Sequence, residues 1–421
     1  MDKQIRTYPI NCGSTPTLRF PEFNGEWELK KLGEVTSYVD YRGRAPIKTE
    51  EGCFLVTAKN IKKGFIDYEC SKEYVAENDY SNVMSKGLPE IGDVLFTTEA
   101  PMGNVAQIDK VNIALAQRVI KFRGKVMLSN FFLLHYMLSD IFQKNISQKS
   151  IGTTVQGISG KELHQIKLSF PTLPEQQKIA TFLTAVDEKL QALKQKKSLL
   201  EQYKKGVMQQ IFSQEIRFTD DKGNAFADWE EKKLGEVGET YGGLSGKSKE
   251  NFGTGKPYIQ YKQIFDDSKI DISRFELVVI AENERQNKVQ FGDVFFTVSS
   301  ETPKEIGMSS VLLDNIEELY LNSFCFGFRA NSSKVLSPYF SQYLFRNEIF
   351  RTEIIKLAQG STRYNMSKIQ LLKIEINLPS IEEQTKIANF LSAIDEKINH
   401  CQAQITNTEV WKKGLLQQMF C

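Results

Sequence analysis

The side chains that could catalyse a reaction form no known constellation in this sequence. The three histidines, His135, His164 and His400, stand far apart, and no Ser/His/Asp set, H-E-x-x-H, G-x-G-x-x-G or Asn-Pro-Pro-Tyr/Phe stretch is present. Six cysteines are scattered without a C-x-x-C pair, so the usual zinc spacings are absent. We therefore expect a chain with no catalytic residue, no metal site and no cofactor of its own.

Two kinds of stretch come close to catalytic motifs. Residues 241–248, YGGLSGKS, resemble a phosphate-binding P-loop, but that pattern needs a glycine where Tyr241 stands. A mobile loop that touches a phosphate backbone and a plain solvent loop both fit these residues better than a nucleotide site. The acidic pairs Asp187-Glu188 and Asp395-Glu396 could suggest a nuclease. They lie within helical patterns, however, where solvated charges or ion pairs between helices are expected.

Basic, polar and aromatic side chains near predicted turns have the chemistry to bind DNA. Arginine and lysine hydrogen-bond to guanine edges, asparagine and glutamine to adenine edges, and phosphate contacts hold a protein in register on the duplex. Taken singly, each could be a solvated surface residue, but several stand at matched positions in two halves of the chain. The candidate DNA-binding residues are Arg42, Arg44, Lys59, Asn60, Thr98, Glu99, Thr153, Thr154, Gln156, Ser245, Lys247, Lys249, Tyr261, Lys262, Ser299, Ser300, Thr362, Arg363 and Tyr364.

The elements that must position these residues occur twice. PTLPEQQKIATFLTAVDEKL begins at Pro171, and PSIEEQTKIANFLSAIDEKI begins at Pro379, 208 residues later. Each copy predicts one long helix with an apolar stripe of coiled-coil period. The first helix, residues 175–212, would span roughly 57 Å at about 1.5 Å per residue. The expected seam residues are Ile179, Val186, Leu193, Leu200 and Val207 in the first copy and Ile387, Ile394, Ile405, Trp411 and Leu415 in the second.

An apolar stripe of this length has to be buried against a partner. The simplest partner is the other copy in the same chain, and the near-identity of the two copies favours a symmetric pairing. The alternative is two separate amphipathic helices, each packed on its own domain.

The repeat extends beyond the helices. Residues 27–35 match 229–237, residues 92–97 (GDVLFT) match 292–297 (GDVFFT), and residues 152–154 match 360–362. The spacing between matched blocks varies from 200 to 208 residues. Insertions and deletions therefore lie between the blocks, as loops on a shared scaffold would place them. The chain is predicted to be two copies of one unit, a globular domain followed by a long helix.

Within a unit the pattern is mixed. Residues 54–58, 94–97, 104–108, 116–122 and 166–170 have strand character, and Ser129 is expected to begin a helix that runs to about Ile146. We predict an α+β fold with an internal pseudo-twofold repeat. The expected limits are 1–170 for the first globular domain, 171–215 for its helix, 216–378 for the second domain and 379–421 for the last helix.

Composition is that of an ordinary globular protein. The hydrophobic fraction is 41%, the charged fraction 25% and the formal net charge +2, which neither demands nor excludes nucleic acid. No apolar run approaches the ~20 residues that span a bilayer, and no signal-peptide pattern opens the chain. Scattered thiols suit a reducing compartment. We therefore expect no membrane contact and a cytoplasmic location.

Together these features resemble the specificity subunit of a type I restriction–modification system. The resemblance rests on GDVLFT at 92–97 and its copy, the loop GTTVQGIS at 152–159 and its copy, PEQQKIA at 174–180 running into a long helix, and the Trp27–Val35 block that opens each half. It covers essentially the whole chain. One departure is Glu382, which stands where the first copy has Pro174.

The resemblance implies a fold, partners and a role. It implies two target-recognition domains separated by two helices packed as an antiparallel coiled coil. It also implies binding to double-stranded DNA with a bipartite target, docking of two methyltransferase subunits, restriction subunits reached through that complex, and no catalysis by this chain. The alternative function is a coiled-coil scaffold that joins proteins without reading DNA; a solitary enzyme is the third hypothesis.

Overall fold

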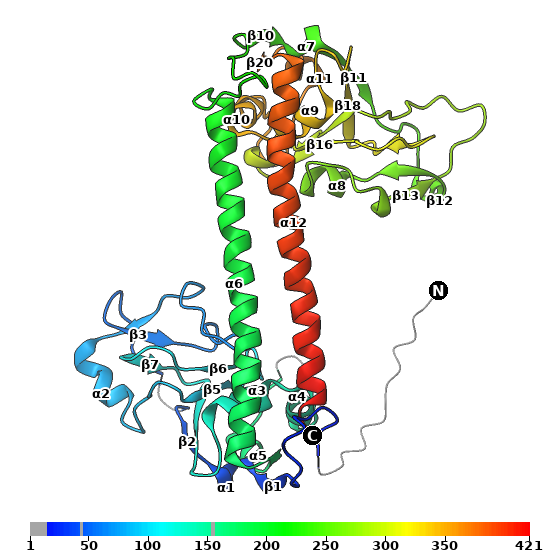
Figure 1. Ribbon diagram of the computed structural model, residues 1–421. Coiled ribbons are helices and arrows are strands. Elements are labelled where there is room, and N and C mark those ends of the chain that lie inside the picture. Colours follow the sequence, from blue (N-terminus) through cyan, green and yellow to red (C-terminus); the bar gives the residue numbers. More distant parts are fainter. Residues whose placement is uncertain (1–14, 43–44, 153–155) are drawn as a thin grey trace. The chain divides into compact units, whose positions relative to one another are not determined.

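The structure, a computed structural model, describes residues 15–42, 45–152 and 156–421. They form two compact units (Figure 1). The first unit runs to Lys194 and also includes Ala403–Cys421, and the second is Gln195–Gln402. The long helices α6 (Leu173–Phe212) and α12 (Ile381–Gln418) each contribute one half to either unit.

The described residues of the first unit's globular part form three sheets. A four-stranded sheet has the order β2-β8-β5-β6, a three-stranded sheet the order β4-β3-β7, and β1 pairs with β9; β3 and β7 are parallel, and the other pairs are antiparallel. The elements are β1 (Glu28–Lys31), α1 (Leu32–Val35), β2 (Thr36–Asp40), β3 (Cys53–Val56), β4 (Tyr74–Val75), α2 (Tyr80–Val83), β5 (Val94–Thr97), β6 (Val105–Gln107), β7 (Ile113–Leu115), β8 (Val119–Gly124), α3 (Asn130–Leu138), α4 (Asp140–Lys149), α5 (Gly160–His164) and β9 (Lys167–Phe170).

The second unit repeats this plan. Its sheets have the orders β11-β18-β14-β16, β13-β12-β17 and β10-β20, and a short pair, β15-β19, is added. The elements are β10 (Glu230–Lys233), α7 (Leu234–Val237), β11 (Gly238–Gly242), β12 (Phe252–Ile259), α8 (Tyr261–Asp266), β13 (Glu276–Val278), β14 (Val294–Thr297), β15 (Ser299–Ser300), β16 (Ser309–Val311), β17 (Tyr320–Leu321), β18 (Cys325–Ala330), α9 (Pro338–Leu344), α10 (Glu348–Lys356), β19 (Tyr364–Asn365), α11 (Lys368–Leu371) and β20 (Glu375–Leu378).

Strand β5 is buried on both faces, which explains why its residues are nearly all apolar. Val94 and Phe96 point into a core shared with the helices, whereas Leu95 points into a second core under the small sheet. In the other unit Val294 and Phe296 lie in the helix-side core and Phe295 in the second core. Each globular part therefore has three layers: helices, the four-stranded sheet and the three-stranded sheet.

The Glu-Gln pair near the start of each long helix joins that helix to its domain. Glu175 is buried and accepts hydrogen bonds from Arg19 Nε and Nη2, both at 2.6 Å, and Gln176 accepts the Ser129 N–H at 2.8 Å. In the second unit Glu383 accepts from Arg217 at 2.8 and 2.9 Å, and Gln384 accepts the Ser337 N–H at 2.8 Å. The repeated motif therefore fixes each helix to its domain by charge-assisted bonds.

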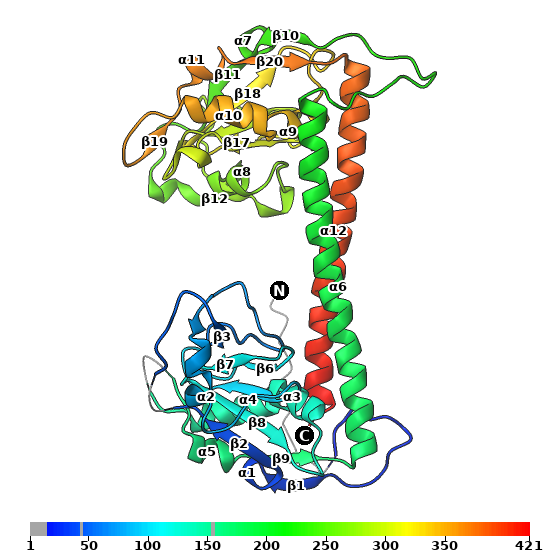
Figure 2. The ribbon, with the colours of Figure 1, turned by 90° about the vertical axis from the view of Figure 1, so that its left-hand side faces the viewer.

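The end of each long helix completes the core of the other helix's domain. In the first unit Phe420, two residues beyond α12, packs with its ring centroid 5.6 Å from that of Phe132. In the second unit the ring centroid of Phe212 of α6 lies 5.7 Å from that of Phe340. Figures 1 and 2 both show the end of α6 beside the globular part of this unit. Each domain is therefore packed against halves of both helices, rather than against its own helix alone.

The expected seam residues differ in burial. Ile179, Val186, Val207, Ile387, Ile394, Ile405 and Leu415 are buried, and Leu193 and Leu200 are half-buried. Trp411 is 47% exposed, with its ring edge-on to Phe182 at 5.9 Å. Burial along the helices is therefore uneven, since Ile405 near the middle of α12 is 4% exposed whereas Trp411, nearer its end, is not buried.

One expected helix is divided in the structure. The helix predicted from Ser129 to about Ile146 is interrupted at Ser139, whose backbone is extended. Ser139 Oγ donates to Tyr136 O at 2.6 Å and accepts the Phe142 N–H at 3.4 Å, so it ends α3 and begins α4. A serine that competes for backbone groups in this way cannot be recognised from hydrophobic periodicity.

Candidate nucleic-acid interface

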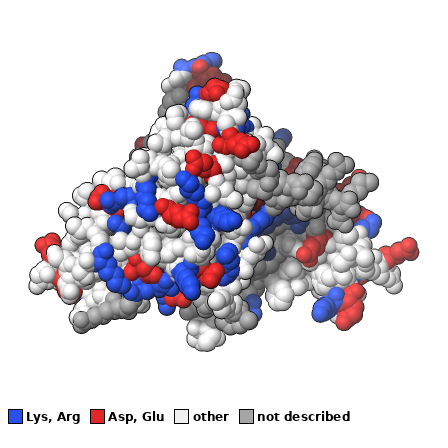
Figure 3. Space-filling view, turned by 90° about the horizontal axis from the view of Figure 1, so that it is seen from below, with Lys and Arg blue, Asp and Glu red and all other residues white. Residues whose placement is uncertain are grey.

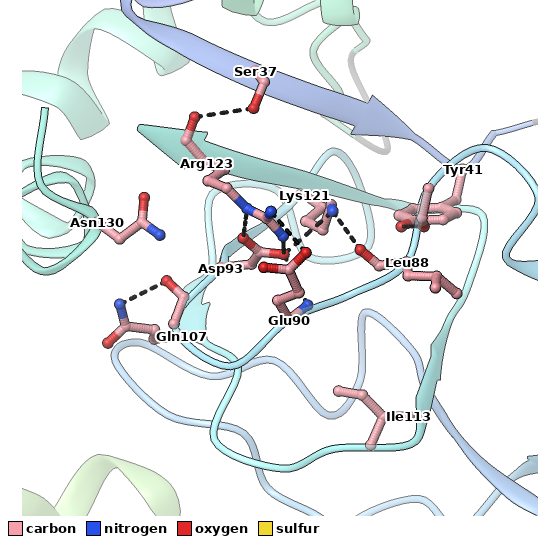
Figure 4. A network of polar contacts seen from close by, with 12 residues as sticks. Ser37, Tyr41, Leu88, Glu90, Asp93, Gln107, Ile113, Lys121, Arg123 and Asn130 are labelled. Atoms are coloured by element: carbon pink, nitrogen blue, oxygen red, sulfur yellow. Dashed lines mark hydrogen bonds and ion pairs between the residues drawn. The ribbon is translucent and has the colours of Figure 1, made fainter. Parts of the chain in front are cut away.

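A buried aspartate at the start of the central strand organises each domain. Asp93 follows Gly92, which has a φ of +90°, and its carboxylate accepts from Arg123 Nε at 2.6 Å and lies 3.2 Å from Lys121 Nζ (Figure 4). Asp293 takes the same place beside Arg329 at 2.7 Å, with the Tyr241 hydroxyl at 2.5 Å instead of a lysine. The Gly-Asp motif thus serves the scaffold and fixes the start of the strand.

The far end of the same strand is held identically in both domains. The Thr98 N–H donates to Arg118 O at 3.1 Å, and Thr98 O accepts the Ile158 N–H at 3.1 Å. In the second domain the Val298 N–H donates to Phe324 O at 3.0 Å, and Val298 O accepts the Met366 N–H at 2.9 Å. The bridge Glu99–Gly157 corresponds to the pair Ser299–Asn365. Segments far apart in sequence therefore converge at this strand end.

In the second domain this convergence forms an open hollow of about 500 Å³. Five sequence-predicted residues line it: Tyr261, Lys262, Ser299, Ser300 and Arg363. The Tyr261 hydroxyl donates to Ser299 O at 2.7 Å, and Lys262 and Arg363 are exposed. Exposed cations around a polar hollow can contact phosphates or base edges.

The first domain has a hollow of about 320 Å³ at the matching position. Lys59 and Ala100 line it where Lys262 and Ser300 line the other. Glu99 lies at the same strand end and forms an ion pair with Arg118 at 2.8 Å. The scaffold is thus repeated, whereas the side chains around the hollow are not.

Many lining residues of these hollows were not expected from the sequence, and two of them occupy equivalent positions in the two domains. Arg118 and Phe324 each stand directly before a core strand, β8 and β18 respectively, and both line their hollows. The signal that could have found them is the alignment of the two halves. When the two halves are aligned, Arg118 and Phe324 occupy the same position, four residues before the matched Phe122-Arg123 and Phe328-Arg329, but differ in residue type.

Several other candidates have polar groups engaged inside the protein. Asn60 is buried, and its amide contacts Thr57, Asp67 and Ser71 within its own loop. Thr98 is buried, with its hydroxyl near Arg118 O at 3.3 Å. Arg42 is bound to the Asp40 carboxylate. As placed, Asn60 and Thr98 are engaged within the domain, whereas the Arg42 side chain is 43% exposed and remains a surface group.

The glycine-rich loop of the second domain is also held internally. The side chain of Lys247 is 8% exposed and pairs with Glu284 at 2.5 Å, and it also donates to Val279 O. Hydrogen bonds from Lys247, Gln286 and the Ala281 N–H lower the pKa of Glu284 to about 2. Ser245 and Lys249 are exposed on the same loop. Lys247 therefore fastens this loop to residues 279–286.

The remaining candidates fall into two groups. Gln156 and Thr362 are exposed on loops, and Tyr364 is half-buried on the short strand β19, where it pairs with Ser300. Arg44, Thr153 and Thr154 lie outside the residues that the structure describes.

The face of the first unit around α1, β1 and α5 has a mixed charge pattern. Figure 3 shows Lys and Arg interleaved with Asp and Glu there. The ion pairs in this region include Lys30–Glu28 at 2.8 Å and Lys149–Glu162 at 3.7 Å. The hollow of the second domain is also mixed in charge, with Asp266, Glu301 and Glu305 beside Lys262 and Arg363. Charge alone therefore does not rank this face against the strand-end hollows as a surface for a phosphate backbone.

Within the described ranges, no group of three or more His, Cys, Asp or Glu side chains is placed to hold a metal ion. Likewise, none of the helices in the described part of the chain is long and apolar enough to cross a membrane.

Comparison with known proteins identifies a family. The model described as "Type I restriction modification DNA specificity domain" matches the chain twice, over residues 24–202 and 227–408. The type I restriction enzyme MjaVIII specificity subunit of Methanocaldococcus jannaschii is 24% identical, over 95% of this chain and 92% of that protein. The putative MjaX specificity subunit of the same organism is 26% identical, over 94% and 93%.

Solved structures agree on the fold. The S subunit of a type I restriction–modification system from M. genitalium is similar with a TM-score of 0.57 at 16% identity, over 97% of this chain and 99% of that chain. A chain from a structure on complex assembly and conformational transition of the type I R-M system has a TM-score of 0.57 at 20% identity, over 93% and 96%.

Proposed function

Because the chain belongs to the family of type I restriction–modification DNA specificity proteins, we propose that it reads a bipartite DNA site, one half-site per domain. The domains assigned to the half-sites are residues 1–170 and 216–378. One observation carries the proposal: equivalent hydrogen bonds hold the strand end in both domains, while the residues around the hollows differ. A repeated scaffold with divergent contact residues suits two different half-sites.

Affinity and sequence preference have separate sources in this proposal. Exposed cations such as Lys59, Lys262 and Arg363 bind phosphates or guanine edges, and phosphate contacts set the register of each domain on the duplex. Side chains around each hollow contact base edges. Because these side chains have diverged, the two half-sites need not be palindromic.

The two long helices act as the spacer between the domains. We assign them to an antiparallel coiled coil with a pseudo-twofold axis. Supporting this, Lys412 pairs with Asp187 in the first unit, and Lys204 pairs with Asp395 at 2.5 Å in the second, each residue lying 208 positions from its counterpart. Equivalent ion pairs across two helices favour one register and orientation.

A pseudo-symmetric spacer offers two equivalent docking surfaces. We assign them to two methyltransferase subunits, with restriction subunits joining through that complex. The similar chain from a structure on type I R-M complex assembly supports this assignment. Methyl transfer and cleavage then belong to the partners, and the present chain supplies sequence specificity.

The test is a map of methylated sites in a strain whose methyltransferase subunits work with this chain alone. The expected result is one split motif with two defined half-sites, together with a complex of one specificity chain and two methyltransferase subunits by mass. Methylation without a shared motif, or partner binding without preference for any duplex, would favour a protein scaffold instead.

A further inference from the structure

The two hollows allow a comparison of the same backbone position in two domains. The Arg118 and Phe324 carbonyls accept the N–H of Thr98 and Val298 at 3.1 and 3.0 Å, so the two positions are equivalent in the fold. Each precedes the strand that pairs with the central strand of its domain. Their side chains, however, have opposite chemistry.

In the first domain this position presents charge. Arg118 Nε lies 2.8 Å from Glu99 Oε1, and the two side chains are 51% and 44% exposed. A guanidinium carries N–H donors on its two terminal nitrogens as well as on Nε. The pair therefore offers two donors next to a carboxylate acceptor.

In the second domain the same position presents an aromatic ring. Phe324 is 61% exposed, yet its backbone is fixed, since its N–H donates to Asn322 Oδ1 at 2.8 Å. It lines the same hollow as Tyr261 and Phe265, whose rings are stacked at 6.1 Å. Phe324 therefore adds an exposed aromatic ring to a hollow otherwise lined largely by polar and charged side chains, and Ser299 replaces the carboxylate of Glu99.

These two surfaces fit different base pairs. In the major groove a G·C pair presents the guanine N7 and O6 acceptors beside the cytosine N4 donor, whereas an A·T pair presents the thymine methyl group. Two adjacent donors followed by an acceptor complement the two adjacent acceptors and the donor of G·C, whereas A·T alternates acceptor, donor and acceptor before the methyl group. An exposed phenyl ring complements that methyl group.

Building on the proposed function, we infer that positions 118 and 324 determine specificity. Arg118 and Glu99 read a G·C pair in the half-site of the first domain, with Arg118 donating to guanine and Glu99 accepting from the cytosine amino group. Phe324 contacts a thymine methyl group in the half-site of the second domain.

The experiment uses the full chain in complex with its methyltransferase subunits. Bound duplexes are selected from a pool randomised over both half-sites and sequenced, for the wild type, Arg118→Ala and Phe324→Ala. Arg118→Ala should reduce discrimination at one G·C position of the first half-site by about 5- to 150-fold. Phe324→Ala should relax one A·T position of the second half-site. All other positions should keep their preferences.

Control variants test whether the loss of any exposed residue of the same kind would change the selected DNA motif. Arg274 forms an ion pair with Asp267 at 2.6 Å with both side chains similarly exposed, and Ile349 is a comparably exposed apolar residue on α10. Arg274→Ala and Ile349→Ala should leave the motif unchanged. Thermal unfolding midpoints close to that of the wild type confirm that all four variants fold.

The outcomes distinguish this inference from the proposed function. A wild-type chain that selects no motif overturns the proposed function itself. A split wild-type motif that neither Arg118→Ala nor Phe324→Ala alters overturns only the inference. A uniform loss of affinity across all sequences would identify phosphate contacts, and a change in the opposite half-site would contradict the domain assignment; both also overturn it.

Discussion

Asp93 and Asp293 occupy the same place in two copies of one sheet but are neutralised differently. Asp93 lies between Arg123 and a nearly buried Lys121, whereas Asp293 lies between Arg329 and the Tyr241 hydroxyl. The position of Lys121 is taken in the second domain by a glycine, Gly327, and a Cβ there would lie 2.1 Å from the Tyr241 ring. The repeat has thus kept the aspartate and exchanged its partners.

Because the partners differ, replacing the aspartate by asparagine should destabilise the two domains by different amounts. Asp93→Asn removes the countercharge of Lys121, whose side chain is 8% exposed, and should destabilise the first domain by about 3–5 kcal/mol. Asp293→Asn loses hydrogen bonds to a more exposed Arg329 and a neutral hydroxyl, and should cost about 1–3 kcal/mol. Hydrogen exchange of the β5 and β14 amides measures each loss. Equal losses would contradict the role of Lys121.

At acidic pH the wild type and Asp93→Asn should have the same free energy of unfolding. Burial raises the pKa of Asp93, but hydrogen bonds from Arg123 and the Glu90 N–H and the charge of Lys121 outweigh it and hold the pKa below its ordinary value. Because the folded pKa is lower than the unfolded one, the carboxylate stabilises the domain above the unfolded pKa of about 3.9. That stabilisation is lost as the pH falls through the folded pKa, so the free energies of unfolding of the two proteins, measured by denaturant titration at each pH, should then converge.

At the scale of elements, the long helices depend on burial at a few positions of each heptad. Val186 and Ile394 are matched residues, 4% and 5% exposed, whereas their neighbours Ala185 and Ala393 are exposed. Both buried residues belong to the helix-side cores of their domains. A charge at either position loses its hydration without gaining a partner.

The double variant Val186→Asp, Ile394→Asp should therefore unfold the spacer and abolish assembly with the methyltransferase subunits. The matched control, Ala185→Asp with Ala393→Asp, adds the same charges on the exposed side and should keep the spacer helical. Because these positions lie on the proposed docking helices, helicity by circular dichroism, not assembly, is the readout for this control. Circular dichroism and the mass of the complex are the measurements. Normal assembly of the first variant would argue against a buried seam.

At the scale of the whole molecule, the boundaries between the units fall within both helices. The first unit contains α6 to Lys194, and the second contains α12 to Gln402. Contacts such as Lys194–Glu409 at 2.7 Å lie within one unit. Residues inserted after Lys194 and Gln402 would therefore leave the internal contacts of both units in place.

Such an insertion tests whether the helices set the distance between half-sites. Four residues in each helix add about 6 Å, close to two base pairs at about 3.4 Å each. They also rotate the rest of the helix by about 40°, against about 70° for two base pairs, so some affinity should be lost. The methylated motif should keep both half-sites, with a spacer longer by one or two base pairs. If an active variant methylates a motif with an unchanged spacer, the partner subunits, not these helices, set the distance between the half-sites.

The sequence alone was sufficient for the features that neighbouring residues encode. Heptad spacing predicted both long helices, and comparison of the halves predicted a duplicated domain, because periodicity and self-similarity are properties of contiguous residues. The candidate DNA-binding residues also included Ser299 and Ser300, which follow the GDVFFT strand and line the hollow of the second domain. The predicted limits of the four segments remain predictions.

Only the tertiary structure shows which candidate side chains are exposed at the strand-end hollows and which are engaged in contacts inside the protein. Lys247 forms an ion pair with Glu284, 37 residues away, and the Asn60 amide donates a hydrogen bond to Asp67 O within its own loop. Residue type alone could not show that these side chains are engaged inside the protein. Arg118 reaches the end of β5 because strand pairing, not sequence spacing, brings residue 118 beside residue 98. Contacts between residues so far apart in sequence depend on how the helices and sheets pack. The local sequence pattern does not encode that packing.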